Sequence, residues 1–439
     1  MEFQAFSYKS LDDIRETAEK TGALIPVSGD LGILSKPLNA NGIKIQNRLA
    51  IQPMEGCDGT TDGSPGSLTI RRYERFAAGG AGLLWFEAVA AVPEGRANPR
   101  QLMLTKKNLD AFKRLANSIR EISMRENGFD PLIIMQVTHS GRYSRPGNKP
   151  EPIIAYNNPV YEKGRPIGSN RIATDDYLDT LAERFAECAY LGQEAGFDGV
   201  DIKACHRYLI CELLSARTRG GSRYGGDFGG RIKLLCDAVK AVRSAVSTDK
   251  IVTTRLNVYD GAVFPYGFGV SEESGLAPEL SEPIELVKTL GRLGMKLINI
   301  TAGNPYVNPH VNRPFDKGFY EPPEHPFEGL GRMYSCVRAV KRECPDILCV
   351  ASGLSYCRQF SPHIAAGLLD NGFADIAGFG REAFAYPDFA RDIFSKNGMD
   401  KNKCCISCGK CSELMRADSM SGCAVRDEVY TLIHKRDVN

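Results

Sequence analysis

The sequence predicts a (β/α)8 TIM barrel, and three observations support this fold class. Eight short apolar runs, rich in β-branched residues, recur along the chain of 439 residues. The runs are continuous rather than alternating, which is typical of parallel strands buried on both faces. A stretch with helical periodicity follows each run, and polar or glycine residues stand where the runs end. Strands and helices that alternate in this way indicate a barrel, in which active sites lie at the carboxyl ends of the strands.

The strands and helices can be placed in order along the chain. The clearest helix is expected over 174–196, where Thr174 is a candidate N-cap, Leu178 and Leu181 share one face, and Gly196 supplies the stop. Two further helices are expected over 229–246 and 363–372. The expected strands are 47–54, 81–90, 131–139, 197–205, 250–257, 296–303, 347–353 and 374–381.

A doubly wound open sheet is the alternative fold. Such a sheet usually carries a strand–GxGxxG–helix unit, and both "GLGRMYS" (329–335) and "GFGREAF" (378–384) lack the third glycine. The barrel is therefore preferred. We expect three parts, namely a mixed N-terminal arm (1–46), the barrel (47–397) and a cysteine-rich C-terminal extension (398–439).

The composition argues against several classes of partner. Hydrophobic residues make up 43% of the chain and charged residues 25%, as in ordinary globular proteins. The formal net charge of +2 provides no field that would attract nucleic acid or an anionic membrane. The N-terminus lacks the pattern of a signal peptide, and no apolar run approaches the roughly 20 residues that span a bilayer. Fourteen cysteines without an export signal indicate reduced thiols in the cytoplasm.

The most informative stretch follows the fourth expected strand, in "GFDGVDIKACHRYL". Lys203 and His206 are two hydrogen-bond donors three residues apart, and Tyr208 comes directly after them. Donors at a barrel strand end can hold a carbonyl oxygen while negative charge develops on it, and Tyr208 or Tyr143 could deliver a proton.

Several motifs resemble the old yellow enzyme family of FMN-containing ene-reductases. They are "NRLAIQPM", "QVTHSGRYS", "GFDGVDIKACHRYL", "RYGGDFGGR" and "ADIAGFGREAFAYPDF", which occur in the family's order over roughly residues 35–395. The resemblance implies a (β/α)8 barrel that binds FMN at its C-terminal face and reduces activated carbon–carbon double bonds.

The resemblance also implies roles for individual residues. Pro53 and Met54 would lie against the isoalloxazine ring, Gln136 would bind its pyrimidine edge, and Arg255 would lie near N1 and O2. Backbone N–H groups beside glycines, together with one arginine, form an anion pocket. The residues implied for the phosphate are Ser352, Gly353, Gly380 and Arg381, and the candidate cofactor contacts are completed by Glu55 and Gly303.

The oxygen-binding pair departs from the family pattern. Lys203 stands where the family usually has histidine, and its charge would favour a carboxylate or a strongly polarised carbonyl. Tyr208 matches the family's proton-donating tyrosine. "HSGRYS" (139–144) is more similar to the 2,4-dienoyl-CoA reductase branch, in which the tyrosine after Gly-Arg is the donor. Tyr143 and Tyr208 therefore both remain candidates.

Four cysteines near the end of the chain have the spacing C-x2-C-x2-C-x11-C, namely Cys405, Cys408, Cys411 and Cys423. Four thiolates suit Zn²⁺ or an iron–sulfur cluster, and zinc sites usually pair their cysteines two and two. The 2,4-dienoyl-CoA reductase and trimethylamine dehydrogenase branch carries a [4Fe-4S] cluster after the barrel, with one more residue between the second and third cysteines. We rank a [4Fe-4S] cluster first, zinc second and unligated thiols third, with Cys404 as an adjacent substitute for Cys405.

These features together predict an FMN-dependent reductase of α,β-unsaturated carbonyl or carboxylic compounds. Electrons would come through the cluster from a separate donor protein, or directly from NAD(P)H, since the sequence has no dinucleotide fingerprint of the FAD- and NAD(P)-binding region of its branch. The alternatives are a flavin and iron–sulfur dehydrogenase of the amine-oxidising type and a non-catalytic electron-transfer subunit. We expect a homo-oligomer, and a long loop (304–329) that covers the flavin, with Tyr306 and His310 as candidate substrate contacts.

Overall fold

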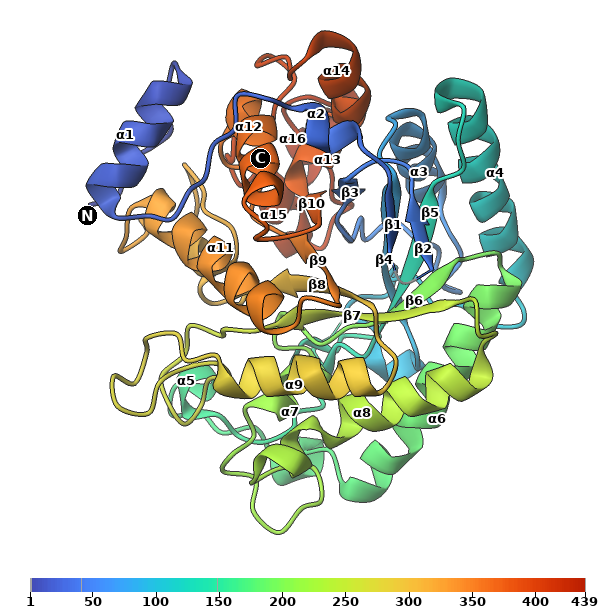
Figure 1. Cartoon of the computed structure of the whole chain (residues 1–439). Helices are drawn as coiled ribbons and strands as arrows, with labels where there is room; N and C mark the ends of the chain where they lie inside the picture. The colour runs from blue at the N-terminus through green and yellow to red at the C-terminus, as the bar shows by residue number, and fades with distance from the viewer. Residues whose placement is uncertain (1, 41, 148, 439) are drawn as a thin grey trace.

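The computed structural model describes residues 2–40, 42–147 and 149–438, so the outermost residues of the predicted arm and extension, Met1 and Asn439, lie outside it. Parallel strands close into a barrel in the order β10-β3-β4-β5-β6-β7-β8-β9 (Figure 1). The predicted (β/α)8 fold is confirmed, and the open-sheet alternative is wrong because β10 pairs with β3 and closes the sheet. The barrel strands are β3 (Leu49–Ile51), β4 (Leu83–Ala90), β5 (Leu132–Thr138), β6 (Gly199–Ile202), β7 (Ile251–Asn257), β8 (Leu297–Thr301), β9 (Leu348–Ala351) and β10 (Ile376–Phe379).

Helices surround this barrel, and their ends follow local sequence signals. α6 (Asp175–Glu194) begins where the Thr174 side chain accepts a hydrogen bond from the Tyr177 N–H, and Gly196 follows it in the left-handed region at φ +94°. α8 begins after Asp227, which accepts from the Gly230 N–H. The other helices of the outer layer are α3 (Ser67–Ala78), α4 (Leu109–Asn127), α8 (Phe228–Ala245), α9 (Ser281–Arg292), α11 (Pro326–Glu343), α12 (Ser361–Asp370) and α14 (Phe389–Lys396).

The N-terminal arm closes the amino end of the barrel. Its strands β1 (Leu38–Ala40) and β2 (Ile43–Ile45) form an antiparallel hairpin. Leu38, Ile43 and Ile45 pack in one apolar cluster with inward-facing strand residues such as Trp85 and Ile134. The arm also contains α1 (Leu11–Thr21), which lies beside α11, and α2 (Gly32–Ser35), which lies beside α12. The hairpin therefore keeps water out of this end of the barrel and leaves the carboxyl end for ligands.

Short helical segments occupy the connections that follow the barrel strands. Each precedes the next outer helix, so all of them belong to the loops where barrel enzymes carry their chemistry. They are η1 (Pro93–Gly95), η2 (Gly141–Tyr143), α5 (Pro159–Glu162), η3 (Ser169–Arg171), α7 (Leu209–Leu214), α10 (Pro309–Asn312), η4 (Arg358–Phe360) and α13 (Arg381–Ala385). Within the described ranges, none of the helices has the length and apolar character that crossing a membrane requires.

The C-terminal extension folds against the barrel near the carboxyl end of β3. It contains α15 (Lys410–Arg416) and α16 (Glu428–Asp437), which are joined by an apolar cluster of their own. Asp427 accepts hydrogen bonds from Arg71 and Arg75 of α3, and the Ser421 N–H donates to the Gly56 carbonyl at 2.7 Å. These contacts hold the extension over the same end of the barrel at which the candidate site residues gather.

Candidate active site

A cavity with a volume of about 1010 Å³ opens at the carboxyl ends of the strands. Most of the predicted site residues meet in its wall, although they come from five strand ends spread over more than three hundred residues. The predicted residues that line it are Pro53, Met54, Glu55, Lys203, His206, Tyr208, Arg255, Ser352, Gly353, Gly380 and Arg381, with Cys411 of the extension.

Three predicted catalytic or cofactor-binding residues lie outside this wall, as does the candidate substrate contact His310. Gln136 is buried, and its amide donates to an oxygen of Asp201 at 2.6 Å. Gly303 has a φ of +69°, and a Cβ there would lie 2.8 Å from the Asn312 backbone nitrogen, so glycine permits α10 to approach β8. Tyr143 lines a neighbouring cavity instead. Their predicted contacts with a cofactor or substrate stay predictions.

Asp201, which the sequence analysis did not single out, organises the barrel interior below the cavity. Its carboxylate accepts from the Gln136 amide, from the Trp85 indole at 2.7 Å, and from the Arg255 backbone N–H at 2.7 Å. Burial raises the pKa of Asp201 to about 6, against the effect of these donors. The network fixes the β7 backbone at Arg255, whose side chain lines the cavity.

The oxygen-binding residues form a compact group with Glu55. The Lys203 ammonium lies 2.9 Å from a Glu55 oxygen and 3.7 Å from the centre of the Tyr208 ring. The Tyr208 hydroxyl donates to the same Glu55 oxygen at 3.3 Å. Burial, and then the charges of Arg255 and Lys203, lower the pKa of His206, so its imidazole is neutral at pH 7. Glu55 thus supplies Lys203 with a counter-ion.

Three tyrosines lie side by side at the edge of the cavity. The Tyr208 and Tyr306 hydroxyls are 3.1 Å apart, and the Tyr306 ring stacks on the Tyr143 ring with centroids 3.9 Å apart. The Tyr143 hydroxyl accepts from the Asn304 amide at 2.9 Å. Burial raises the pKa of Tyr143 to about 12, and burial and the Glu55 charge raise the pKa of Tyr208 well above its usual range, so both phenols keep their protons. Tyr208 lines the main cavity, whereas Tyr306 lines both cavities.

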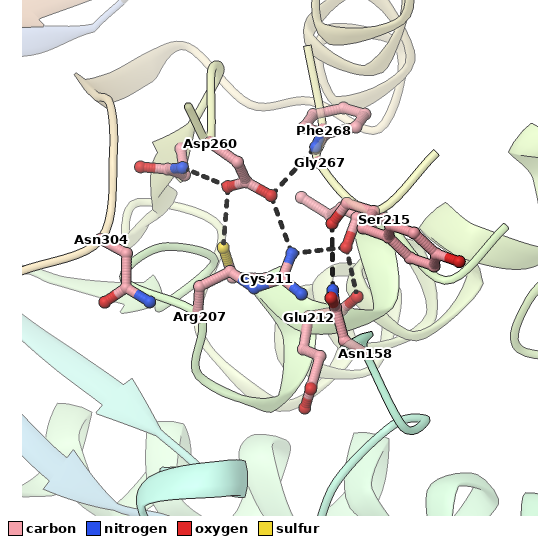
Figure 2. Close-up of polar contacts among 12 residues, drawn as sticks. Asn158, Arg207, Cys211, Glu212, Ser215, Asp260, Gly267, Phe268 and Asn304 are labelled. Carbon is pink, nitrogen blue, oxygen red and sulfur yellow. Dashed lines mark hydrogen bonds and ion pairs between the residues drawn. The ribbon is translucent and has the colours of Figure 1, made fainter. Parts of the chain in front are cut away.

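A strained turn aims His206 and Tyr208 into the site. His206 and Arg207 have φ values of +62° and +59°. These lie in the left-handed region, which residues other than glycine rarely adopt. The Arg207 side chain is fully buried, and its guanidinium donates to Asp260 at 2.8 Å and to the Ser215 hydroxyl. Figure 2 shows Asp260 between Arg207 and the Phe268 N–H, which donates to it at 2.9 Å. The buried ion pair therefore holds the turn in place.

A second buried ion group supports the segment that carries Pro53, Met54 and Glu55. Arg72 of α3 forms ion pairs with both Asp58 and Glu87, and Glu87 accepts from the Gly56 N–H at 2.9 Å. A Cβ at Gly56 would lie 2.2 Å from an Arg72 nitrogen, so only glycine allows this approach. Glu87, which lies within β4, thus supports this segment without lining the cavity itself.

One end of the cavity concentrates positive charge. Arg313 and Arg381 both line it, together with Ser352, Ser355 and the Gly353 backbone. Burial, and then the nearby Arg381 charge, lower the pKa of Arg313 to about 10. The sequence analysis missed Arg313, although it belongs to the long loop that was expected to cover the site. Two guanidinium groups beside serine and glycine suit an anion such as a phosphate.

Three buried nitrogens in this wall lack a hydrogen-bond partner among the described residues, namely Arg255 Nε, His206 Nε2 and Arg381 Nη1. Buried donors are normally paired, so their presence at one cavity indicates a ligand that carries acceptor oxygens. A molecule with a phosphate at one end and carbonyl oxygens at the other fits this donor set. FMN is such a molecule.

The four predicted cluster ligands surround a smaller cavity of about 370 Å³, which is lined by Cys405, Cys408, Cys411 and Cys423. Arg381, Phe384 and Cys411 line this cavity and the main cavity alike. Cys404 lies outside the lining, where its thiol donates to the Asp400 carbonyl at 3.3 Å. In the part of the chain that is described, no three cysteine, histidine, aspartate or glutamate side chains are grouped as ligands of a metal ion.

Comparison with known proteins places this site in a family. A sequence profile of the NADH:flavin oxidoreductase / NADH oxidase family matches residues 34–300. The chain belongs to this family. It is an FMN-dependent oxidoreductase, as the donor set of the main cavity had indicated.

The relatives of this flavin oxidoreductase differ in length. It is 26% identical over 374 residues to the NADH oxidase of Thermoanaerobacter brockii. The matched region covers 83% of this chain but only 51% of that protein. Thus the chain spans about half the length of this curated relative.

Two solved structures share the fold of this flavin oxidoreductase. A 2-naphthoyl-CoA reductase matches with a TM-score of 0.73 and 20% identity, over 92% of this chain and 58% of that one. An old yellow enzyme homologue from Zymomonas mobilis matches with a TM-score of 0.62 and 22% identity, over 84% and 94%. At these identities the likeness concerns the fold alone.

Proposed function

We propose that this protein is an FMN-dependent reductase of activated carbon–carbon double bonds in α,β-unsaturated carbonyl or carboxylic compounds. The observation that carries the proposal is that Lys203, His206 and Tyr208 share one cavity wall with the candidate FMN contacts. FMN bound there supplies a hydride from its N5 to the β-carbon of the substrate.

Residues at the two ends of the cavity would hold FMN. Pro53 and Met54 would offer apolar contacts to the flat ring, and Arg255 would donate to its carbonyl edge. Arg381 and Arg313 would bind the phosphate, with the Gly353 N–H and neighbouring serines completing the anion site. Arg313 extends the phosphate site beyond the residues that the resemblance implied.

Lys203 and His206 would hold the carbonyl oxygen of the substrate. Both are donors, and both keep negative charge on that oxygen stabilised as it develops in the transition state. His206 acts as a neutral N–H donor because burial lowers its pKa. Glu55 lies 2.9 Å from the Lys203 ammonium and already balances its charge. This balance favours a neutral carbonyl over a carboxylate, which would meet repulsion from Glu55.

Tyr208 is the better candidate for the proton donor. It lines the same cavity as the oxygen-binding pair, whereas Tyr143 faces the neighbouring cavity and is held by Asn304. The raised pKa of Tyr208 keeps its phenol protonated until the α-carbon of the substrate accepts the proton. The Tyr306 hydroxyl, 3.1 Å from that of Tyr208, can then return a proton to it.

The four cysteines would hold a [4Fe-4S] cluster. A single zinc ion needs its ligands to converge to about 2.3 Å from one point, whereas in a cluster each thiolate binds its own iron. These thiols line one cavity together, and among the described residues no three side chains are grouped as ligands of one metal ion, which favours the second arrangement. A cluster there supplies one-electron transfer, for which the source would be a separate donor protein. NAD(P)H acting directly on FMN is the other route that we propose.

The oxygen-binding assignment is tested with the Lys203→Ala/His206→Ala variant and 2-cyclohexen-1-one, a simple unsaturated ketone. We expect kcat/KM to fall by about 10³-fold or more, since removing one such donor costs roughly 10²–10³-fold. FMN content, read from visible absorbance, should stay unchanged. Lys233→Ala, on the outer helix α8, is the control. Unchanged turnover and affinity in the double variant would show that the assignment is wrong.

A further inference from the structure

A second cavity, with a volume of about 910 Å³, adjoins the main one. Glu55, Tyr306 and Met415 line both cavities. The two cavities therefore share part of their lining, and a ligand that occupied both would pass beside these side chains. Neither the sequence motifs nor the proposed chemistry assigns a role to this second cavity.

Two of the four arginines that line the second cavity are neutralised. Arg142 forms buried ion pairs with Glu162 and Glu212. Arg145 forms an ion pair with Asp418, which lines the same cavity. Both arginines therefore already have carboxylate partners, and a ligand anion would have to compete with these.

Among the described residues, the contacts of the other two arginines, Arg100 and Arg416, carry no opposite charge. Arg100 donates to the carbonyl of Cys57 at 2.8 Å and to that of Asp418. Arg416 is exposed, and its guanidinium lies 4.2 Å from the centre of the Phe319 ring.

The acidic groups near these arginines are already paired. Glu55, in the shared wall, is ion-paired with Lys203. Asp437, whose pKa is lowered in small part by Arg100, is ion-paired with Arg436. The second cavity therefore offers two cationic groups to a ligand that carries negative charge.

We propose that the second cavity binds a phosphate-bearing part of a ligand whose reacting end lies in the main cavity, with Arg100 and Arg416 as the binding groups. This inference rests on the proposed function of the main cavity. Guanidinium groups bind phosphate oxygens in pairs, with a geometry that an ammonium cannot offer. The phosphate belongs either to a nicotinamide dinucleotide that reduces the flavin or to a phosphate-bearing carrier attached to the unsaturated substrate.

The binding test uses the full FMN-loaded chain and sodium pyrophosphate, titrated by calorimetry. We expect Arg100→Gln/Arg416→Gln to weaken binding by about tenfold or more, because each charge-assisted hydrogen bond contributes roughly one decade. Arg338→Gln is the matched control, since its guanidinium also lies over a phenylalanine ring, that of Phe373 at 4.8 Å, and it lies outside both cavities. Equal affinity of the double variant and the wild type overturns the proposal, as does a wild type that binds no pyrophosphate.

Steady-state KM values for the reductant and for two unsaturated substrates identify the source of the phosphate. If the reductant carries it, the double variant raises KM for NADPH and leaves KM for 2-cyclohexen-1-one unchanged. If the substrate carries it, the double variant raises KM for crotonyl-CoA and leaves KM for NADPH unchanged. Unchanged KM values for both phosphate-bearing compounds overturn the proposal. Pyrophosphate binding needs no turnover, so a failure of the proposed reductase chemistry remains distinguishable from a failure of this site.

Discussion

At the scale of single residues, Tyr208 and Tyr143 differ in the space that their hydroxyls face. Tyr208→Phe should lower the rate of 2-cyclohexen-1-one reduction by about 10²-fold or more, since general acid catalysis contributes roughly that much. Tyr143→Phe should leave the rate close to that of the wild type, because its hydroxyl is held by Asn304 beside the second cavity. Steady-state kinetics with equal FMN content check both variants. A large loss of rate in Tyr143→Phe alone would show that Tyr143 is the proton donor.

His139 makes stability depend on pH. It is buried, its Nδ1 accepts from the Gly141 N–H at 3.0 Å, and its other nitrogen meets the Tyr177 hydroxyl at 2.8 Å. Burial lowers its pKa to about 4, against about 6.5 in the unfolded chain. The neutral form is favoured in the fold, so its contribution is complete above pH 6.5 and is lost as pH falls towards 4.

The expected loss from His139 is about 2 kcal/mol of unfolding free energy between pH 7 and pH 5. His139→Asn keeps an acceptor near the Gly141 N–H but cannot be protonated in this range, so its stability should fall by less. Urea unfolding of both proteins at the two pH values measures the difference. Parallel losses in the two proteins would assign the acid sensitivity to other groups.

Residues that line the main cavity were predictable from the sequence when they stood at strand ends within recognisable motifs. Lys203, His206 and Tyr208 are within six residues of each other, and the structure brings all three to the main cavity. Arg313 and Asp201 were missed, because their importance depends on partners that are distant in sequence. A single sequence carries no signal for such pairs.

At the scale of elements, the turn after β6 depends on a side chain that never reaches the cavity. Asp260→Asn would leave the buried Arg207 guanidinium without its counter-ion, and we expect a loss of about 3 to 5 kcal/mol in unfolding free energy. Arg207→Gly/Asp260→Asn should regain at least about 1 kcal/mol over the single variant, because glycine adopts the turn's positive φ without strain. Denaturant unfolding measures both. A double variant that is less stable than Asp260→Asn would contradict this view of the turn.

The barrel strands were predictable because strands buried on both faces appear as continuous apolar runs, and each expected range contains the observed strand. Six of the eight predicted ranges extend beyond the carboxyl end of the strand, whereas those of β4 and β7 end where the strand ends. At β3 the expected range 47–54 shortens to Leu49–Ile51, since the chain leaves the sheet to line the cavity with Pro53 and Met54. The hairpin of the arm was not predicted, because its two strands have three residues each and little periodicity.

At the scale of the whole molecule, the iron, sulfide and FMN content per chain tests whether the extension adds a cluster to the flavin barrel. Anaerobically purified protein should contain about four irons, four acid-labile sulfides and one FMN per chain. Cys411→Ser should lose the iron, since Cys411 lines the small cavity, whereas Cys404→Ser should keep it because Cys404 lies outside that lining. Metal and flavin analysis of the three proteins tests this. One zinc per chain, or no metal at all, would make the terminal cysteines structural.

The extension also affects the order in which the molecule can be assembled. Cys411, Ser412, Met415 and Ser421 all line the main cavity, so one side of the proposed flavin site is built from residues that the ribosome adds after every barrel strand. Folding generally proceeds with the earlier parts of a chain first. The barrel can therefore close while its mouth is still open on that side. Loading of the flavin and docking of the last segment become late steps of biogenesis, and a chain arrested before residue 411 would be a folded barrel with an unfinished pocket.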